Sequence, residues 1–210
     1  MFITSLCHTF LGKFGGVIIV VLEKHDLDTI NSIKDFDCKI LYQENKGYGD
    51  ALIKGIKNVK TNFFCIFNAD GSFNPTELQN MYDHVLKKNA DFVFGSRYIK
   101  NASSEDDTII TLIGNKIFTL IGKIFFSLPI SDILYTFVLG NTQKANTLQL
   151  KEKDFSFCVE LPILAKKSNY KLISVSSHER SRIAGKKKVN EFKDGLLILT
   201  SMIKLYFKKN

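Results

Sequence analysis

Short apolar runs alternate with amphipathic stretches through the first half of the chain. The runs are rich in β-branched and aromatic residues, which predicts strands at residues 17–22, 38–42, 63–67 and 91–95. The stretches between them carry apolar residues at helical spacing, which predicts helices at 27–34, 49–58 and 75–88. The first run, VIIVVL, is continuous and is typical of a buried parallel strand. Alternating strands and helices predict βαβ units and a mostly parallel sheet.

The second half of the chain contains longer helical patterns. They predict helices at 108–126, 155–167 and 191–207, and a strand at 171–175. The helices at 108–126 and 195–207 are apolar with lysines at their edges, which suits a helix lying in lipid headgroups and equally a helix that packs on a core. No apolar run approaches the roughly 18 residues that span a bilayer, and residues 1–14 lack the pattern of a signal peptide. Without a repeat or a linker, we expect a single domain over 1–210, with a candidate membrane-surface helix at 191–210.

Composition is that of an ordinary globular protein, with 45% apolar and 24% charged residues in 210. The net charge of +8 favours an anionic partner such as a nucleotide, a phospholipid surface or a nucleic acid, or simply reflects a lysine-rich soluble face. The four cysteines are far apart and form no zinc-binding pattern. They are typical of thiols in a reducing, cytosolic compartment.

The stretch Asn68-Ala69-Asp70-Gly71 follows the apolar run 63–67 and precedes a predicted helix. A strand that ends in this way delivers an amide and a carboxylate to the carboxyl edge of a sheet, where α/β proteins bind ligands. Two such oxygens at positions i and i+2 suit a hard divalent cation that bridges to a diphosphate. An Asx turn or a helix N-cap at Asp70 is the alternative interpretation.

Two further segments point to phosphate. A strand and a helix are joined by a turn that contains Lys46, Gly47 and Gly49. The glycines allow backbone N–H groups to approach a phosphate. The alternative is a glycine turn that binds nothing. The segment is neither a Walker loop nor a complete dinucleotide fingerprint. Arg97 follows the run 91–95 and can hold a phosphate through its fork of donors, or form an ion pair with the acidic run 105–107.

Two isolated acids and one basic segment complete the candidates. Asp132 and Glu160 each interrupt an apolar stretch, so each is predicted to be paired, to cap a helix or to take part in chemistry. The basic segment 179–188, which contains Arg182 and Lys188, can bind a diphosphate, a lipid phosphate or a membrane surface. Because it has no interleaved aromatic residues, it disfavours nucleic acid.

Taken in order, these segments resemble a family 2 glycosyltransferase of the GT-A fold, close to the dolichol-phosphate mannose synthase and polyprenyl-phosphate sugar transferase branch. The similarity runs from about Val17 to the C-terminus. It is carried by the glycine-bearing turn 45–55, the D-x-D-type segment 68–70, G-[ST]-R-Y at 95–98, S-D-[ILV] at 131–133, F-x-x-E-[LM] at 157–161 and R-x-x-G-x-[SK]-K at 182–188.

The resemblance implies roles for these residues. Asp70 and Asn68 would bind the Mg²⁺ or Mn²⁺ ion that holds the diphosphate of a nucleotide-sugar donor. Asp132 would be the base for a hydroxyl acceptor, with Glu160 as the second candidate. The residues implied in binding donor or acceptor phosphates are Lys46, Gly47, Gly49, Asn68, Asp70, Arg97, Arg182 and Lys188.

Three departures from the family pattern qualify the resemblance. Residues 1–16 contain no P-x-[YF]-N-E segment, so the expected fold is an N-terminally shortened α/β sheet flanked by helices. The strand that usually ends in V-D-D-x-S here ends in Val21-Leu22-Glu23-Lys24-His25-Asp26. Asn68 replaces the first acid of the D-x-D motif, and because an amide adds no negative charge, metal affinity should fall.

The expected function is an enzyme that moves a sugar from a nucleotide sugar to a polyprenyl phosphate or a cell-envelope glycan. Its expected location is the cytoplasm, peripheral on the cytoplasmic face of the cell membrane, with no nucleic-acid partner. The departures favour an alternative, a degenerate GT-A-like protein that binds a lipid or a protein without catalysis. A nucleotidyltransferase would need a glycine- and lysine-rich loop near the N-terminus, which the sequence lacks.

Overall fold

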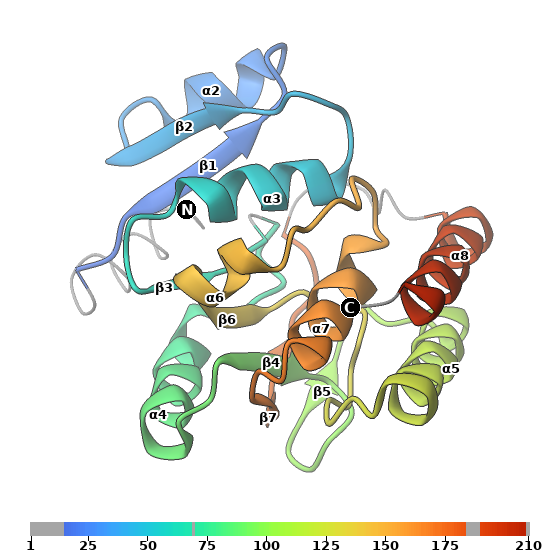
Figure 1. The fold of residues 1–210 in the computed structure, drawn as a ribbon. Helices are drawn as coiled ribbons and strands as arrows, with labels where there is room; N and C mark the ends of the chain where they lie inside the picture. Colours follow the sequence, from blue (N-terminus) through green and yellow to red (C-terminus); the bar gives the residue numbers. More distant parts are fainter. Residues whose placement is uncertain (1–14, 69, 184–189, 209–210) are drawn as a thin grey trace.

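The computed structural model describes residues 15–68, 70–183 and 190–208, in which strands and helices alternate as the pattern predicts (Figure 1). The strands are β1 (Ile18–Leu22), β2 (Cys38–Tyr42), β3 (Phe63–Cys65), β4 (Phe92–Ser96), β5 (Ser103–Ser104), β6 (Val138–Asn141), β7 (Leu172–Ser176) and β8 (His178–Glu179). The α-helices are α2 (Leu27–Ile33), α3 (Tyr48–Asn58), α4 (Leu78–Lys88), α5 (Ile109–Phe126), α6 (Thr142–Thr147), α7 (Phe157–Lys167) and α8 (Glu191–Phe207). A 3₁₀ turn, Pro75–Glu77, leads into α4.

The central sheet has the strand order β3-β6-β4-β7. β4 and β7 pair in parallel, whereas β6 runs antiparallel between β3 and β4. β6 was missed in the sequence because it is short and ends in Gly140-Asn141, two residues typical of turns. The α/β class of the fold is confirmed, with one antiparallel strand inserted among parallel ones.

Helices cover both faces of this sheet. α4 packs on one face, where Met81 and Val85 meet Val93 of β4. α7 packs on the other, and its apolar residues join Phe92 and Phe94 in a separate cluster. Successive residues of β4 therefore point into opposite layers, as a strand buried on both faces requires.

β1 and β2 form a parallel pair of their own, beside α2 and α3, at one end of the molecule (Figure 1). Of the five residues of β1 only Leu22 is buried, and Val17 just before the strand is 66% exposed. The prediction of a buried parallel strand at 17–22 is therefore confirmed for the strand and its parallel direction, and wrong for its burial. Within the described residues, β1 pairs with β2 along one edge only, and α3 packs against it. The side chains of β1 are therefore only partly covered.

Candidate functional site

Asp70 lies just past the carboxyl end of β3, in a tight turn. Its Oδ1 accepts hydrogen bonds from the backbone N–H of Ser72 (3.0 Å) and from the Ser72 hydroxyl (2.7 Å). Its Oδ2 lies 3.9 Å from Nε of Arg182, on the opposite side of the site. The Asx turn, one of the two interpretations that the sequence offered, is thus present and uses one carboxylate oxygen. The other oxygen faces the arginine, and the metal-binding role of Asp70 stays a prediction.

Asn68 is held by an aromatic side chain from the start of α3. The Tyr48 hydroxyl donates to Oδ1 of Asn68 (3.1 Å) and lies 2.6 Å from Oγ1 of Thr136. The Tyr48 ring stacks on Phe155 with 5.0 Å between centroids. Burial raises the pKa of Tyr48 far above its usual range, so the hydroxyl stays neutral and remains a donor.

The segment before residue 184 carries Arg182 alongside Asp70. Its backbone is fixed there by two hydrogen bonds, from the N–H of Ile183 to the carbonyl of Asp70 (2.8 Å) and from the N–H of Arg180 to the carbonyl of Ser72 (2.9 Å). Nε of Arg182 donates to Asp106 (2.9 Å). Lys188, which the sequence placed in the same basic segment, lies outside the described residues.

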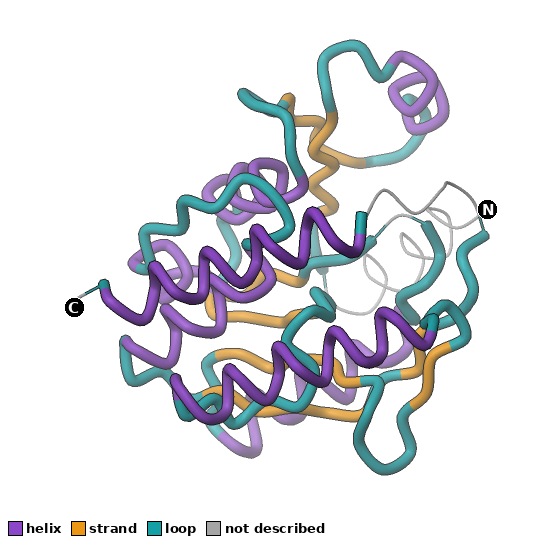
Figure 2. The backbone as a smooth tube through the Cα atoms, turned by 90° about the vertical axis from the view of Figure 1, so that its right-hand side faces the viewer, coloured by secondary structure: helices purple, strands orange, loops and turns teal. Residues whose placement is uncertain are grey.

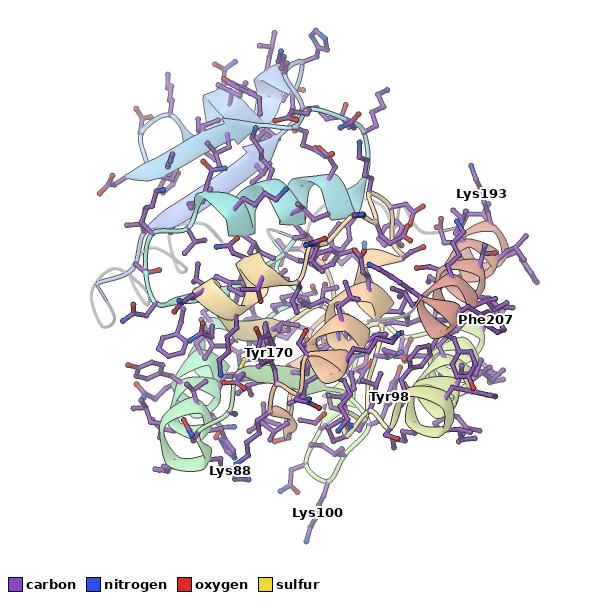
Figure 3. The ribbon with its side chains drawn as sticks, viewed as in Figure 1. Lys88, Tyr98, Lys100, Tyr170, Lys193 and Phe207 are labelled. Atoms are coloured by element: carbon purple, nitrogen blue, oxygen red, sulfur yellow. The ribbon has the colours of Figure 1, made fainter. Side chains whose placement is uncertain are left out.

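An acidic run before α5 holds the basic segment from the other side. Glu105 accepts hydrogen bonds from the N–H (3.1 Å) and the hydroxyl (3.2 Å) of Ser181, and these bonds lower the pKa of its carboxyl. The hydroxyl of Tyr98, which Figure 3 labels, donates to Asp107. Glu105 and Asp106 therefore bind the basic segment, whereas Asp107 binds Tyr98 and Thr111. The acidic run does not pair with Arg97, which was the alternative that the sequence offered.

Arg97 is buried in a different ion-pair network. Its guanidinium donates twice to Asp132, at 2.8 and 3.0 Å, and once to Glu179 at 3.0 Å. Burial alone would lower the pKa of Arg97, but the charge and hydrogen bonds of Asp132 and the charge of Glu179 together outweigh burial and hold this pKa well above its usual range. The resemblance assigns the Arg97 guanidinium to an acceptor phosphate. Among the described residues, Asp132 and Glu179 already accept its hydrogen bonds.

Asp132 is fully buried and makes four hydrogen bonds. Besides the two from the Arg97 guanidinium, it accepts one from the Arg97 backbone N–H (3.1 Å) and one from the Asn115 side-chain amide. Four donors surround the carboxylate and leave little room for the hydroxyl of an acceptor to contact it. Its predicted role as a base stays a prediction, and its contacts favour a positioning role.

Glu160 faces a backbone loop. Its carboxylate accepts hydrogen bonds from the N–H groups of Lys151 and Glu152 at 2.9–3.0 Å, and burial raises its pKa despite these bonds. It thereby shapes residues 151–154, which pack against the turn before α3. The role of Glu160 at the reaction centre also stays a prediction.

The glycine turn owes its composition to that same loop. A Cβ at Gly47 would lie 2.1 Å from the carbonyl oxygen of Lys153, and a Cβ at Gly49 would lie 2.2 Å from that of Glu152. Any larger residue would collide with backbone, so the plain structural interpretation accounts for both glycines. Lys46 is exposed beside them.

Four residues of the site were not singled out from the sequence: Tyr48, Thr136, Phe155 and Asp106. Tyr48 lies within the glycine motif, directly before Gly49. This position is the one feature of the sequence that could have drawn attention to it. Thr136 and Phe155 carry no local signal, because their approach to Tyr48 depends on tertiary contacts.

The donor set suits a hard divalent cation. Asp70 offers a carboxylate and Asn68 an amide oxygen, and Mg²⁺ or Mn²⁺ is commonly held by one or two such protein oxygens, with a substrate diphosphate and water completing the shell. No group of three or more His, Cys, Asp or Glu side chains gathers anywhere in the described part of the chain. The residues therefore fit a metal that arrives with its diphosphate, and they do not form a self-sufficient metal site.

Comparison with known proteins agrees with this geometry. The model of glycosyl transferase family 2 matches residues 18–148. The uncharacterized protein MJ1222 of Methanocaldococcus jannaschii is 27% identical over 172 residues, which are 79% of this chain and 71% of that protein.

Solved structures show the same fold at low sequence identity. Glucosyl-3-phosphoglycerate synthase from Mycobacterium tuberculosis, in complex with UDP, gives a TM-score of 0.70 at 12% identity, covering 100% of this chain and 76% of that one. Mannosyl-3-phosphoglycerate synthase from Rubrobacter xylanophilus gives 0.68 at 13% identity, covering 97% and 66%. One further structure of the mycobacterial synthase contains Mn²⁺, UDP and phosphoglyceric acid.

Proposed function

Because the chain belongs to glycosyl transferase family 2, we propose that it transfers a sugar from a nucleotide-sugar donor to a lipid phosphate. The observation that carries this proposal is the convergence of Asp70 and Arg182, 3.9 Å apart, from two segments far apart in the sequence. A carboxylate suits the cation of a diphosphate, and a guanidinium suits its oxygens. Similar proteins are described in complex with UDP and Mn²⁺, which supports the same donor chemistry here.

The chain's own residues divide the work at the donor. Asp70 and Asn68 would hold Mg²⁺ or Mn²⁺, an ion that neutralises charge developing on the departing diphosphate. Tyr48 fixes the Asn68 amide with its oxygen toward the hydroxyl. Arg182 would exchange its bond to Asp106 for the diphosphate, and Lys188 remains a predicted second cation.

The hydrogen bonds of Asp132 favour an acceptor that is already anionic. A hydroxyl acceptor needs a carboxylate to take its proton, whereas a phosphate does not. Since Asp132 accepts four hydrogen bonds, a polyprenyl phosphate fits better than a glycan hydroxyl, which is the second candidate acceptor. A similar mycobacterial synthase is described in complex with phosphoglyceric acid, which is also an anion. A lipid acceptor places the protein at the cytoplasmic face of the cell membrane.

A non-catalytic binding role is the alternative, favoured by Asn68 in place of an acid. Melting temperature, measured with UDP-, GDP- and CDP-sugars with and without Mn²⁺, separates the two. At a ligand concentration about 100 times Kd, stability rises by about 2.7 kcal/mol, which is roughly 5–10 °C for a chain of this size. We expect a Mn²⁺-dependent rise with one nucleotide.

Two variants make this experiment specific. Asp70→Asn should abolish the Mn²⁺ dependence, and Asp83→Asn, on the outer part of α4, should leave it intact. The absence of a shift with every donor, for a folded protein, would overturn the proposed transfer and support the binding role.

A further inference from the structure

α5 and α8 lie side by side on one flank of the molecule (Figures 1 and 2). The Tyr206 ring of α8 contacts Phe125 and Phe126 of α5, with centroids 5.7 and 6.0 Å apart. Near the other end, a Cβ at Gly195 would lie 3.9 Å from the Phe118 ring. The contacts occur in the same order along both helices, so the helices run parallel and begin at the same end.

α5 differs from a soluble surface helix, whose outward face is polar, because its outward face is apolar and its inward face mixes apolar Phe126 with polar residues. It buries two polar residues, Asn115 and Thr119, against the body of the protein. Its outward stripe is apolar and 52–76% exposed, and consists of Ile109, Ile113, Ile117, Leu120 and Ile124. The stripe follows i+3 and i+4 spacing, so it forms one continuous face.

α8 presents a second apolar stripe beside the first. One face of this helix packs inward through Ile198, Met202 and Leu205. Its outward face is apolar as well, 37–84% exposed, and consists of Phe192, Leu196, Leu199, Ile203 and Tyr206. We refer to the two outward stripes together as the α5/α8 face. Apolar surface of this extent usually marks an interaction site.

Lysines border this face and acids are scarce on it. Exposed lysines lie on both helices and at the end of α8: Lys116, Lys123, Lys193, Lys204 and Lys208. α5 carries no acid, and of the two acids of α8, Asp194 is buried. Figure 3 shows Lys193 and Phe207 on the outer side of α8, away from the sheet.

We propose that the α5/α8 face docks on a bilayer that contains anionic phospholipids, with both helices lying in the headgroup region. The inference rests on the proposed function in one respect, since it supplies the surface on which a lipid-phosphate acceptor is presented. Apolar stripes edged by lysines are the chemistry of interfacial helices. A second copy of the chain fits worse, because a symmetric contact would bring the lysine borders of two such faces together.

Docking flat, and not spanning, follows from the inward contacts of α5. By length and composition α5 is apolar enough to cross a membrane, with 17% of it buried in the protein, contrary to the expectation from the sequence that no apolar run is long enough to span a bilayer. The Asn115 amide, however, donates to buried Asp132, and the Thr119 hydroxyl accepts from the N–H of Ile133 (3.2 Å). Withdrawing α5 into a bilayer would leave these buried groups unsatisfied.

The position of the two helices places the candidate site beside the membrane. α5 begins directly after the acidic run that binds Arg182, and α8 begins shortly after the basic segment. Ile183, next to Arg182, is 69% exposed. A flat bilayer under the α5/α8 face would therefore lie next to the segment that carries Arg182.

The absence of tryptophan gives a direct reporter. Phe192→Trp places one tryptophan on the face, where residue 192 is 84% exposed, and Tyr42→Trp places one on β2, where residue 42 is 42% exposed. With vesicles of phosphatidylcholine and phosphatidylglycerol, we expect a blue shift and quenching by brominated lipid for the first variant only. Equal responses from both, or none from either, would overturn the proposal.

Matched leucine variants measure the contribution of the face by vesicle flotation. Leu120→Ser with Leu196→Ser removes two leucines from it, and Leu27→Ser with Leu86→Ser removes two of similar exposure elsewhere. We expect about a tenfold or greater loss of partitioning for the first pair and little change for the second. Equal losses, with both pairs folded by circular dichroism, would contradict docking through this face.

The lysines and the oligomeric state complete the test. Lys116→Gln with Lys123→Gln should weaken binding to anionic vesicles by about fivefold for each lysine, and should change binding to pure phosphatidylcholine little. A dimer seen by sedimentation that the Leu120→Ser and Leu196→Ser pair dissolves, without vesicle binding by the wild type, would overturn the proposal in favour of a second copy. Vesicle binding needs no sugar nucleotide, so this test and the donor test fail independently.

Discussion

Arg97 and Arg182 provide a test of whether the structure separates a structural arginine from a ligand-binding one. Each is replaced by methionine, which has a similar length and no charge. Arg97 has a side chain 11% exposed and is paired with Asp132 and Glu179, whose side chains are 0% and 9% exposed. Arg182 is 28% exposed and is paired with Asp106, which is 26% exposed.

The expected free-energy changes differ because the desolvation differs. Removing one partner of a buried pair leaves an uncompensated charge and costs about 3–5 kcal/mol. Arg97→Met leaves two buried carboxylates, so we expect a loss of unfolding free energy in the upper part of that range. A partly exposed pair contributes about 1 kcal/mol or less, which is the expected loss for Arg182→Met.

Urea unfolding followed by circular dichroism measures both variants against the wild type. The nucleotide-dependent rise in melting temperature should disappear in Arg182→Met while its fold persists. Arg97→Lys, which keeps the charge but loses the fork of donors, should fall between wild type and Arg97→Met. If Arg97→Met unfolds within about 1 kcal/mol of the wild type, the buried network is not as described and an acceptor role for Arg97 regains its basis.

Three further predictions concern the site and its supporting loop. Asn68→Asp adds a charge beside the predicted metal position and should tighten Mn²⁺ binding in the presence of UDP at least about fivefold, by titration calorimetry, since one added charge at 4 Å contributes about 1 kcal/mol even in water. Gly49→Ala should cost about 1–3 kcal/mol in urea unfolding, because its Cβ would lie 2.2 Å from the carbonyl oxygen of Glu152, whereas Gly55→Ala, with its nearest neighbour at 3.4 Å, should be neutral or stabilising. Burial raises the pKa of Glu160, so ionised Glu160 opposes folding, and the wild type should gain unfolding free energy relative to Glu160→Gln as the pH falls from 7 towards 4.5; a gain in the opposite direction would show that the backbone hydrogen bonds outweigh burial.

Much of the fold was predictable because buried strands and amphipathic helices leave periodic signals. The runs that became β2, β3 and β4 were located from their apolar residues alone. The position of Asp70 at the carboxyl edge of the sheet was predictable for a similar reason, since a polar motif directly after a buried strand must lie at that edge. β6 was not predictable, because an antiparallel strand inserted between β3 and β4 is specified by long-range pairing and not by its own four residues.

The partners of the charged candidates could not be predicted, because ion pairs depend on which segments meet in space. The sequence suggested that Arg97 could pair with the acidic run 105–107, but its ion pairs are with Asp132 and Glu179. The acidic run meets the basic segment instead, through Arg182. Both arrangements satisfy the same charges, and only the topology, with β5 beside β8, decides between them.

α5 shows why periodicity alone left its role open. A stripe of apolar residues at helical spacing identifies a face, but not the side of the helix on which the protein lies. The opposite face decides which side of α5 packs on the protein, because Asn115 donates to Asp132 there. Leaving a buried carboxylate without this donor costs more free energy than burying another isoleucine would gain. The polar interior of the Arg97 network therefore turns the apolar stripe of α5 outward, and this coupling predicts that Asn115→Leu would destabilise the fold while leaving vesicle binding by the folded fraction intact.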